Sequence, residues 1–312
     1  MDKKVLVTGG AGFIGSHLVD RLVQDGWCVT IVDDLSRGKV ENLNPKAKFY
    51  KCELNENKLH DIIEQAAPNI VFHLAAQIDI RLSVNNPMAD AETNIKGSLN
   101  LLQACHHKGV ERIIFSSTGG AMYGDPNELP VGEDLLPAPD SPYAISKLAV
   151  EHYLRFYEKV YGIKSVSLRY GNVYGPRQDS LGEAGVIAIF TQAVLSGKRP
   201  TIYGDGEQLR DYIYIDDVVD ANIASIDYDI PYPINIGTGI GTSVNKLYKR
   251  IATSIEFSSQ PHYAEARPGE IMRCFLDCKA ALAYLKWYYK VSLYDGLERT
   301  IRWYKERREG CT

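Results

Sequence analysis

Residues 5–15 read Val5-Leu6-Val7-Thr8-Gly9-Gly10-Ala11-Gly12-Phe13-Ile14-Gly15, a short apolar run followed by a glycine-rich turn. The spacing Gly9-x-x-Gly12-x-x-Gly15 lets the backbone turn tightly and approach a pyrophosphate, which would lie against the N–H groups of the next helix. An ordinary strand-to-helix turn is the alternative, because glycine spacing alone is weak evidence in a chain with 26 glycines. The position between an apolar run and a helical segment favours a dinucleotide site.

A pair of acids ends the second apolar run, because Asp33-Asp34 follows Val29-Thr30-Ile31-Val32 and lies 18 residues after Gly15. An acidic side chain at this point can accept hydrogen bonds from both ribose hydroxyls of an adenosine and would repel a 2′-phosphate. Arg37 weakens the inference, since a guanidinium could pair with that phosphate. We expect NAD rather than NADP.

Similar β-branched runs recur along the first half of the chain and alternate with helical segments such as 13–24 and 91–107. The runs lie at residues 5–7, 29–32, 49–52, 70–74, 112–116 and 165–169. Continuous apolar runs suit a parallel sheet that is covered on both faces, and the alternation gives βαβ units. The sequence predicts an α/β fold with a doubly wound, Rossmann-like parallel sheet over residues 1–171. A smaller mixed α/β substrate domain is expected over 172–312, joined to the first by a segment around 211–236.

Composition excludes several classes of protein. The 312 residues are 45% hydrophobic and 24% charged, which is ordinary for a globular chain of about two domains. A net charge of −4 argues against a nucleic-acid partner. We find no apolar run long enough to span a membrane and no signal peptide, so we expect a cytosolic protein. The six cysteines form no Cys-x-x-Cys pair and His106-His107 lacks metal-binding spacing, so we expect free thiols and no metal site.

A tyrosine and a lysine share one helix face in Tyr143-Ala144-Ile145-Ser146-Lys147. A cation there, together with an oxidised nicotinamide, would lower the pKa of the phenol and make Tyr143 a usable base. The spacing alone is uninformative, because 20 tyrosines in the chain produce it by chance. The preceding strand ends at Ser116-Ser117-Thr118, and strand ends of a parallel sheet face the cofactor, so Thr118 could bind a substrate hydroxyl. A Ser/Thr cap or turn is the alternative for this segment.

These motifs occur in an order that resembles the extended short-chain dehydrogenases/reductases, specifically their NAD-dependent nucleotide-sugar epimerase/dehydratase family. The resemblance rests on residues 8–15, 73–77, Asn94-x-x-Gly97, 116–118, 143–147 and Arg169-Tyr170-Gly171-Asn172. It implies that Tyr143, Lys147 and Thr118 are catalytic. It implies NAD contacts at Gly9, Gly12, Phe13, Ile14, Gly15, Asp33, Leu35, Ser36, Arg37, Gly38, Glu53, Leu54, Leu74, Ala75, Ala76, Gln77, Asn94, Ser116, Tyr143, Lys147, Tyr170 and Val173. It implies substrate contacts at Ser83, Thr118, Asn172, Gly185, Val186, Tyr203, Arg210, Arg267, Glu270 and Cys274.

The residues after Thr118 bear on the reaction. Members of the family that dehydrate or decarboxylate carry Asp or Glu directly after the catalytic Thr, whereas this chain has Gly119 and Gly120. We therefore expect NAD-dependent 4-epimerisation of UDP-hexoses through a transient 4-keto sugar. The alternatives are another nucleotide-sugar dehydrogenase, reductase or epimerase, and a non-catalytic NAD-binding scaffold.

Two further expectations follow from the resemblance. Cys274 falls where family members that accept N-acetylated hexoses carry a small residue, so UDP-GlcNAc and UDP-GalNAc are expected as substrates beside UDP-glucose and UDP-galactose. A buried structural cysteine is the alternative. Members of the family commonly form homodimers through two helices per subunit, which here would be about 94–107 and 143–161. His106, His107 and His152 would then be interface or solvent residues.

Overall fold

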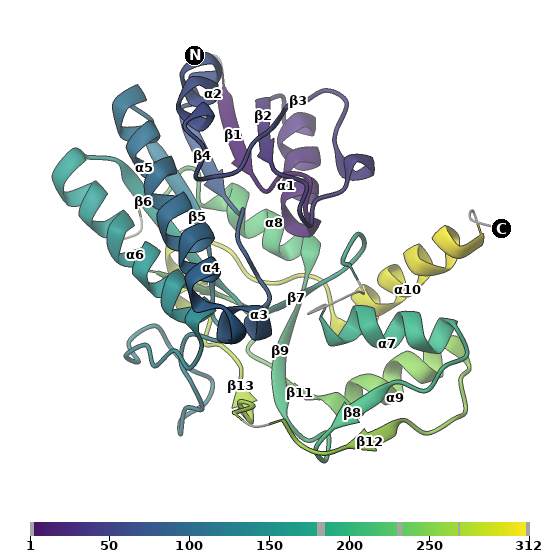
Figure 1. Ribbon diagram of the computed structural model, residues 1–312. Helices are drawn as coiled ribbons and strands as arrows, with labels where there is room; N and C mark the ends of the chain where they lie inside the picture. Colours follow the sequence, from purple (N-terminus) through teal and green to yellow (C-terminus); the bar gives the residue numbers. More distant parts are fainter. Residues whose placement is uncertain (1–2, 180–184, 230–232, 268, 310–312) are drawn as a thin grey trace.

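The computed structural model describes residues 3–179, 185–229, 233–267 and 269–309, which form a larger and a smaller part (Figure 1). The larger part is built on a seven-stranded parallel sheet with the strand order β10-β6-β5-β4-β1-β2-β3. Its strands are β1 (Lys4–Thr8), β2 (Cys28–Asp33), β3 (Lys48–Lys51), β4 (Ile70–His73), β5 (Arg112–Thr118), β6 (Lys164–Tyr170) and β10 (Ile234–Ile236). The predicted doubly wound parallel sheet is confirmed.

Helices cover both faces of this sheet. On one face α1 (Phe13–Gln24) and α8 (Ile215–Ala224) pack on the side chains that include Val5 and Val7. On the other face Leu6 packs with α2 (Lys58–Ala66), α5 (Gly97–Lys108) and α6 (Pro142–Tyr161). Neighbouring residues of β1 thus enter opposite cores, as the two-residue period of a strand requires. A strand buried on both faces must be apolar throughout, which explains the continuous runs in the sequence.

Three short helical elements lie between β4 and α5. They are α3 (Ile80–Asn85), α4 (Pro87–Ala91) and the π-turn η2 (Glu92–Lys96), which leads directly into α5. The expected helix over 91–107 is therefore continuous but contains a π-turn. Asn94 lies in this turn, and π-turns often mark functional sites.

The smaller part consists of short strands and three helices. A four-stranded sheet has the order β11-β9-β13, with β7 pairing β9, and β12 pairs β8. The strands are β7 (Asn172–Tyr174), β8 (Thr201–Tyr203), β9 (Leu209–Tyr214), β11 (Gly241–Ser243), β12 (His262–Ala264) and β13 (Arg273–Cys274). The helices are α7 (Val186–Leu195), α9 (Val244–Ile255) and α10 (Leu293–Glu309). Two short turns complete the described elements of the chain: η1 (Val40–Asn42), between β2 and β3 of the larger part, and η3 (Ala281–Leu285), after β13.

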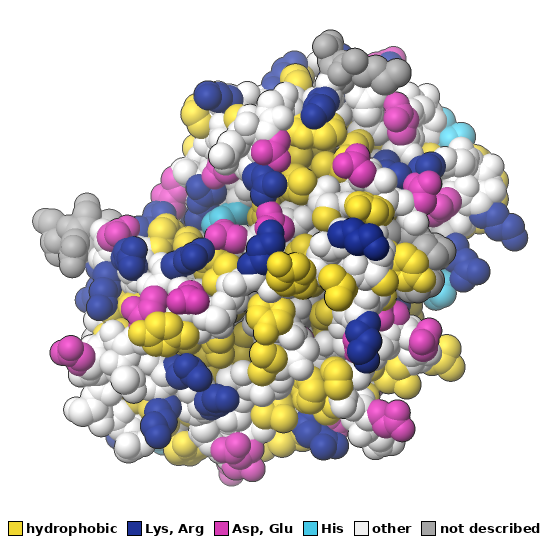
Figure 2. All heavy atoms as spheres, turned by 180° about the vertical axis from the view of Figure 1, so that it is seen from behind, with side chains coloured by type: hydrophobic (Ala, Val, Ile, Leu, Met, Phe, Trp, Pro, Cys, Tyr) yellow, Lys and Arg dark blue, Asp and Glu magenta, His cyan; other side chains and the backbone are white. Residues whose placement is uncertain are grey.

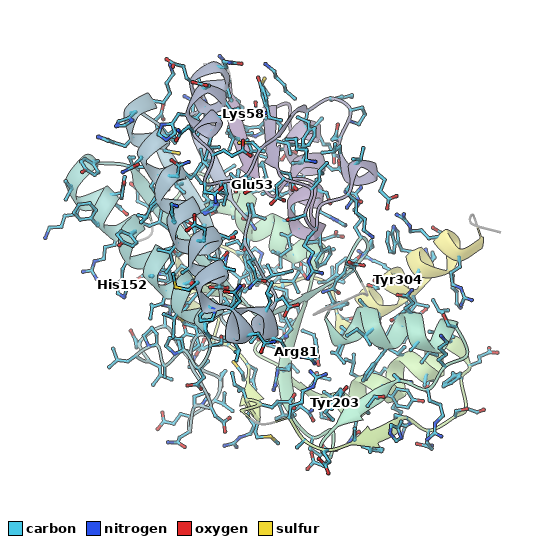
Figure 3. All side chains as sticks on the ribbon, in the orientation of Figure 1. Glu53, Lys58, Arg81, His152, Tyr203 and Tyr304 are labelled. Atoms are coloured by element: carbon cyan, nitrogen blue, oxygen red, sulfur yellow. The ribbon has the colours of Figure 1, made fainter. Side chains whose placement is uncertain are left out.

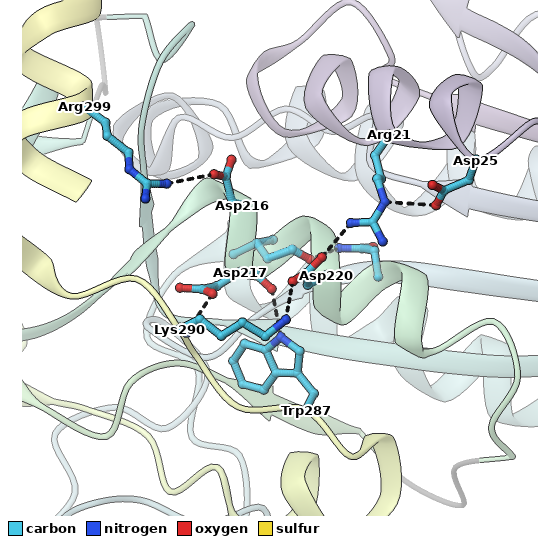
Figure 4. A network of polar contacts seen from close by, with 10 residues as sticks. Arg21, Asp25, Asp216, Asp217, Asp220, Trp287, Lys290 and Arg299 are labelled. Atoms are coloured by element: carbon cyan, nitrogen blue, oxygen red, sulfur yellow. Dashed lines mark hydrogen bonds and ion pairs between the residues drawn. The ribbon is translucent and has the colours of Figure 1, made fainter. Parts of the chain in front are cut away.

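Polar contacts hold α8 between the two parts, although it follows β9 in the chain. Figure 4 shows Asp220 of α8 between Arg21 of α1, at 2.6 Å, and Lys290, at 2.8 Å. Asp217 is buried and accepts the backbone N–H groups of Lys290 and Val291. These contacts hold α8 in place where the chain passes from β9 of the smaller part to β10, the edge strand of the large sheet.

The face opposite to that of Figure 1 carries basic and acidic side chains interspersed with apolar patches (Figure 2). Among the described residues, no helix combines the length and the apolar character that crossing a membrane would require.

Candidate active site

The turn after β1 is possible only with glycine at two positions. Gly9 has a φ of +71°, and a Cβ there would lie 2.7 Å from the backbone N of Ala75. A Cβ on Gly15 would lie 2.1 Å from the carbonyl O of Gly9. The turn therefore packs against the end of β4 on one side and against the first turn of α1 on the other.

The N-terminus of α1 is open to a ligand. Gly12 is the N-cap residue of this helix and makes no side-chain capping bond, and the first turn carries no acidic residue. The N–H groups of the first helical turn thus lack a side-chain acceptor, and the helix dipole adds positive charge there. This cradle fits the pyrophosphate of NAD, with Phe13 and Ile14 half-buried beside it.

Asp33 ties the glycine turn to the loop after β2. Its Oδ2 accepts the backbone N–H of Ala11 at 2.9 Å, and its Oδ1 accepts that of Leu35 at 2.9 Å. Burial raises the pKa of Asp33, while these two hydrogen bonds lower it. Each carboxylate oxygen has capacity for a further donor, such as a ribose hydroxyl. Gly38 is required beside it, because a Cβ there would lie 2.5 Å from Oδ1.

Arg37, which could have held a 2′-phosphate, has a protein partner. Its Nη2 lies 3.6 Å from Oδ2 of Asp79, and its side chain is half exposed. The pairing reduces the positive charge that Arg37 offers to a phosphate, so it favours NAD over NADP.

The other predicted cofactor residues follow strand ends of the large sheet. Leu35 and Ser36 come after β2, Glu53 and Leu54 after β3, and Leu74, Ala75, Ala76 and Gln77 after β4, while Ser116 and Tyr170 lie near the ends of β5 and β6. The carboxyl ends of parallel strands lie at one edge of the sheet, so the fold brings these residues together. Val173 follows the end of β6 by three residues and lies in β7. Figure 3 shows Glu53 in the larger part, at this edge.

Asn94 is fixed beside Gln77. The side-chain Oδ1 of Asn94 accepts the backbone N–H of Gln77 at 2.8 Å, and its Nδ2 donates to the backbone O of Gln77 at 2.9 Å. The same Nδ2 donates to the buried carboxylate of Asp90 at 3.0 Å. The amide of Asn94 thus holds the loop after β4 against the π-turn.

Tyr143 and Lys147 lie in the first two turns of α6, whose N-cap Ser141 accepts the N–H of Ala144. The Nζ of Lys147 donates to the carbonyl O of Ser116 at 2.8 Å and lies 5.8 Å from the centroid of the Tyr143 ring. Burial lowers the pKa of Lys147 to about 8. Burial also raises the pKa of Tyr143 above its ordinary value. The phenol is therefore neutral unless further positive charge enters the site.

The hydroxyl groups at the end of β5 have different surroundings. Ser117 is buried, and its Oγ donates to Oε1 of Glu151 at 2.5 Å. Thr118 is the last residue of β5, lies opposite Tyr170 in the sheet and is half-buried. Because the Ser117 hydroxyl is committed to Glu151, the geometry favours Thr118 as the hydroxyl available to a substrate.

The smaller part gathers four of the predicted substrate residues. The guanidinium of Arg210 lies 3.5 Å from the carboxylate of Glu270. The guanidinium of Arg267 stacks 3.8 Å above the ring of Tyr203, which Figure 3 shows in the smaller part. A planar guanidinium can bind phosphate through paired hydrogen bonds, so two of them at this point suit a pyrophosphate.

The remaining predicted substrate residues have varied settings. Asn172 is exposed beside Gly120, where a Cβ would lie 3.4 Å from its Oδ1, and Gly185 and Val186 begin α7. Cys274 is 2% exposed, and its Sγ lies 3.6 Å from the carbonyl O of Gly119. Ser83 is fully buried, and its hydroxyl donates to the carbonyl O of Ile80.

Two polar residues near Arg210 are absent from the predicted site: Gln208, which directly precedes β9, and Tyr212, which lies in β9. The hydroxyl of Tyr212 and Oε1 of Gln208 are buried and have no hydrogen-bond partner among the described residues. Tyr212 lies two positions after Arg210 in β9, so the period of a strand places these two on one face. Gln208 contacts Glu270, which also pairs with Arg210. A sequence signal was thus present in the alternation of Arg210 and Tyr212. Buried orphan groups beside two arginines are suited to hydrogen-bond a bound ligand.

The described residues contain no cluster of three or more His, Cys, Asp or Glu side chains that could hold a metal ion. Five cysteines are free thiols, and the sixth, Cys311, lies outside the described residues.

Known proteins resemble the chain over nearly its whole length. A UDP-glucose 4-epimerase from Thermotoga maritima, solved with UDP-glucose, is 47% identical, covers 97% of this chain and 99% of its own, and superposes with a TM-score of 0.96. A UDP-glucose 4-epimerase from Thermus thermophilus, solved with NAD, is 42% identical with a TM-score of 0.92, covering 96% of this chain and 98% of its own.

A third structure is a UDP-N-acetylglucosamine 4-epimerase from Methanobrevibacter ruminantium in complex with UDP-N-acetylmuramic acid. It is 39% identical, covers 98% of this chain and 99% of its own, and has a TM-score of 0.93. The sequence profile of the NAD dependent epimerase/dehydratase family matches residues 5–237. The glycine turn, the strand-end residues and the Tyr143–Lys147 pair thus belong to a member of the NAD-dependent epimerase/dehydratase family.

Proposed function

We propose that the protein catalyses the reversible 4-epimerisation of UDP-hexoses. The observation that carries this proposal is the loop after Thr118, where Gly119 and Gly120 stand in place of an acid or base directly after the catalytic Thr118 in the sequence. The next carboxylate along the chain, Asp125, is engaged, because its Oδ1 accepts the backbone N–H of Arg273 at 3.0 Å. A site that can form a 4-keto sugar but lacks a second acid–base pair is suited to reduce that sugar again.

The residues of the larger part provide the proton transfer. Tyr143, as phenolate, removes the proton from the sugar 4-hydroxyl, and Thr118 orients that oxygen. The ammonium group of Lys147, held by the carbonyl of Ser116, stabilises the phenolate. NAD bound in the glycine turn would supply the hydride acceptor and donor. If the hydride returned to the other face of the 4-keto sugar while Tyr143 gave its proton back to O4, the carbon would be inverted with no net redox change.

The residues of the smaller part hold the remainder of the substrate. Arg210 and Arg267 bind the pyrophosphate, and the orphan hydroxyl of Tyr212 supplies a further donor on the same strand as Arg210. An anchor at the diphosphate leaves the sugar free to rotate about its bonds to the phosphate. Such a rotation is required if both faces of the 4-keto sugar are to meet the same nicotinamide.

We include N-acetylated UDP-hexoses among the substrates. Two observations support this. The small side chain of Cys274 lies beside Gly119 in the loop after Thr118, and a UDP-N-acetylglucosamine 4-epimerase is among the relatives.

We further propose a homodimer formed through α5 and α6. Along α6 the apolar side chains of Ile145, Phe156, Val160 and Tyr161 are exposed, which is unusual for one helix of a monomer. The rings of His106 on α5 and Tyr161 on α6 stack with centroids 4.1 Å apart, so the two helices present one continuous surface.

The test is turnover of UDP-glucose and UDP-GlcNAc, followed separately by NMR of the anomeric protons, with no added cofactor. The parent protein should interconvert the 4-epimers and should purify with NAD, whereas a reductase would need fresh cofactor in each cycle. Tyr143→Phe should lower turnover by a factor of roughly 10² or more while retaining NAD. Tyr288→Phe, at an exposed tyrosine, is the matched control. Near-normal turnover in Tyr143→Phe would refute the mechanism.

A further inference from the structure

One buried acid touches the catalytic helix although no motif includes it. Asp90 lies in α4, is fully buried, and its Oδ2 accepts the hydroxyl of Ser146 at 2.6 Å. Ser146 stands between Tyr143 and Lys147 in the sequence, on α6, and α4 packs against α6. The carboxylate therefore contacts the catalytic helix within the turn that carries the base and its cation.

The other oxygen of this carboxylate holds the cofactor side of the site. Oδ1 of Asp90 accepts hydrogen bonds from Nε2 of Gln77 at 2.9 Å and from Nδ2 of Asn94 at 3.0 Å. Both partners are predicted NAD contacts, and they also bond to each other. Asp90 is thus the shared acceptor of three segments: the loop after β4, the π-turn and α6.

The carboxylate oxygens of Asp90 accept three hydrogen bonds from described residues, one from each of the three segments. We propose that Asp90 is a positioning residue that anchors the helix of Tyr143 and Lys147 to the Gln77–Asn94 segment, and that its negative charge holds Lys147 in the ammonium form. A buried charge is retained at a high desolvation cost, which a purely structural contact would not need.

The negative charge of Asp90 affects the pKa values of both Lys147 and Tyr143. Burial is the main cause of the lowered pKa of Lys147, and the charge of Asp90 opposes it more than that of Glu151 does. The same charge adds to the effect of burial in raising the pKa of Tyr143. Removal of the Asp90 charge should therefore lower the pKa of both groups.

The other ionisable groups around Lys147 are buried or have fixed partners. Glu151 is paired with Arg169. Burial lowers the pKa of His73 to about 3, so its imidazole is neutral, and burial raises the pKa of Tyr170. A change in the titration of Lys147 on substitution of Asp90 is thus attributable to Asp90.

The experiment compares Asp90→Asn with the parent by nitrogen-15 NMR of the lysine ammonium groups, with the Lys147 signal assigned from Lys147→Met. We expect the pKa of Lys147 to fall by about one unit. Asp217→Asn is the matched control. It removes a buried carboxylate of α8 that accepts two backbone N–H groups, those of Lys290 and Val291, and it should leave the pKa of Lys147 unchanged. An unchanged pKa of Lys147 in folded Asp90→Asn would overturn the proposal.

Activity gives the second measurement, and here the inference rests on the proposed function. In Asp90→Asn both limbs of the pH profile of kcat should move to lower pH, because Tyr143 and Lys147 both lose a proton more easily. Asp90→Glu retains the charge and should restore both limbs toward the parent. Absence of epimerisation in the parent would refute the proposed function alone, since the NMR titration needs neither substrate nor turnover.

If Asp90→Asn does not fold, Ser146→Ala tests the anchoring role of Asp90. It removes the bond to α6 but keeps the charge, so kcat should fall by about tenfold with the limbs in place, and Ser146→Thr should restore it. An unchanged kcat in Ser146→Ala would contradict the anchoring role.

Discussion

Glu151 and Arg169 form a two-pronged ion pair one helical turn beyond Lys147, with both side chains 5% exposed. Nε and Nη2 of Arg169 donate to Oε1 and Oε2 of Glu151 at 3.0 and 2.7 Å. Glu151 also accepts the hydroxyl of Ser117, and Arg169 donates to the hydroxyl of Tyr123. The pair therefore ties α6 to β5 and β6 one turn beyond Lys147.

Glu151→Gln should destabilise the protein by about 3–5 kcal/mol, because it leaves the Arg169 guanidinium buried without a counter-charge. Urea unfolding measures the free energy directly. Glu158→Gln, at an exposed position of the same helix, should change it by no more than about 0.5 kcal/mol. A loss at Glu151 as small as that at Glu158 would mean that the pair contributes little.

Local spacing explains which parts of the site could be predicted. The glycine turn, Asp33 and the Tyr143–Lys147 pair each depend on contacts within one element or between consecutive ones, so the sequence carries them directly. The parallel sheet follows in the same way from continuous apolar runs.

Contacts between distant segments could not be predicted. Asp90 meets Ser146 across 56 positions, and Ser117 meets Glu151 across 34, and only the packed core determines both distances. The choice of Thr118 over Ser117 depended on the second contact. Likewise, the stacking of Arg267 on Tyr203 depends on how β8 meets the segment before β13.

Gly15→Ala should abolish cofactor retention. The new Cβ would lie 2.1 Å from the carbonyl O of Gly9, so the turn or α1 must shift and the pyrophosphate cradle must open. NAD content per chain after gel filtration gives the result. Gly132→Ala, where a Cβ meets nothing within 4 Å, should retain the parent's NAD content. Full retention in Gly15→Ala would show that the cradle tolerates the shift.

Cys274→Tyr should remove activity on UDP-GlcNAc and leave activity on UDP-glucose, because the larger ring takes the space available to an N-acetyl group. The residue also packs with Met122 and Leu276, so overpacking is expected to cost about 1–3 kcal/mol. Parallel assays of the two substrates and a thermal unfolding curve separate the effects. Cys274→Ser is the size-matched control. Loss of both activities in a folded Cys274→Tyr protein would refute the specificity role.

His73 links stability to pH. Its imidazole is buried between the hydroxyls of Thr8 and Ser98, at 2.9 and 2.8 Å. Burial is the main cause that lowers its pKa from 6.5 to about 3, with a smaller effect from the charge of Lys147. Between these two values the unfolded chain binds a proton that the folded protein does not. Stability from this residue is therefore complete above pH 6.5 and is lost as the pH falls toward 3.

His73→Gln should remove this dependence. The parent's free energy of unfolding should fall by about 1.4 kcal/mol per pH unit more steeply than that of the variant between about pH 6 and pH 4, since one proton fewer is taken up on unfolding of the variant. Urea unfolding at a series of pH values measures the two slopes. His152→Gln, at an exposed histidine of α6, should keep the parent's slope. Parallel curves for the parent and His73→Gln would mean that His73 is protonated in the folded protein over this range.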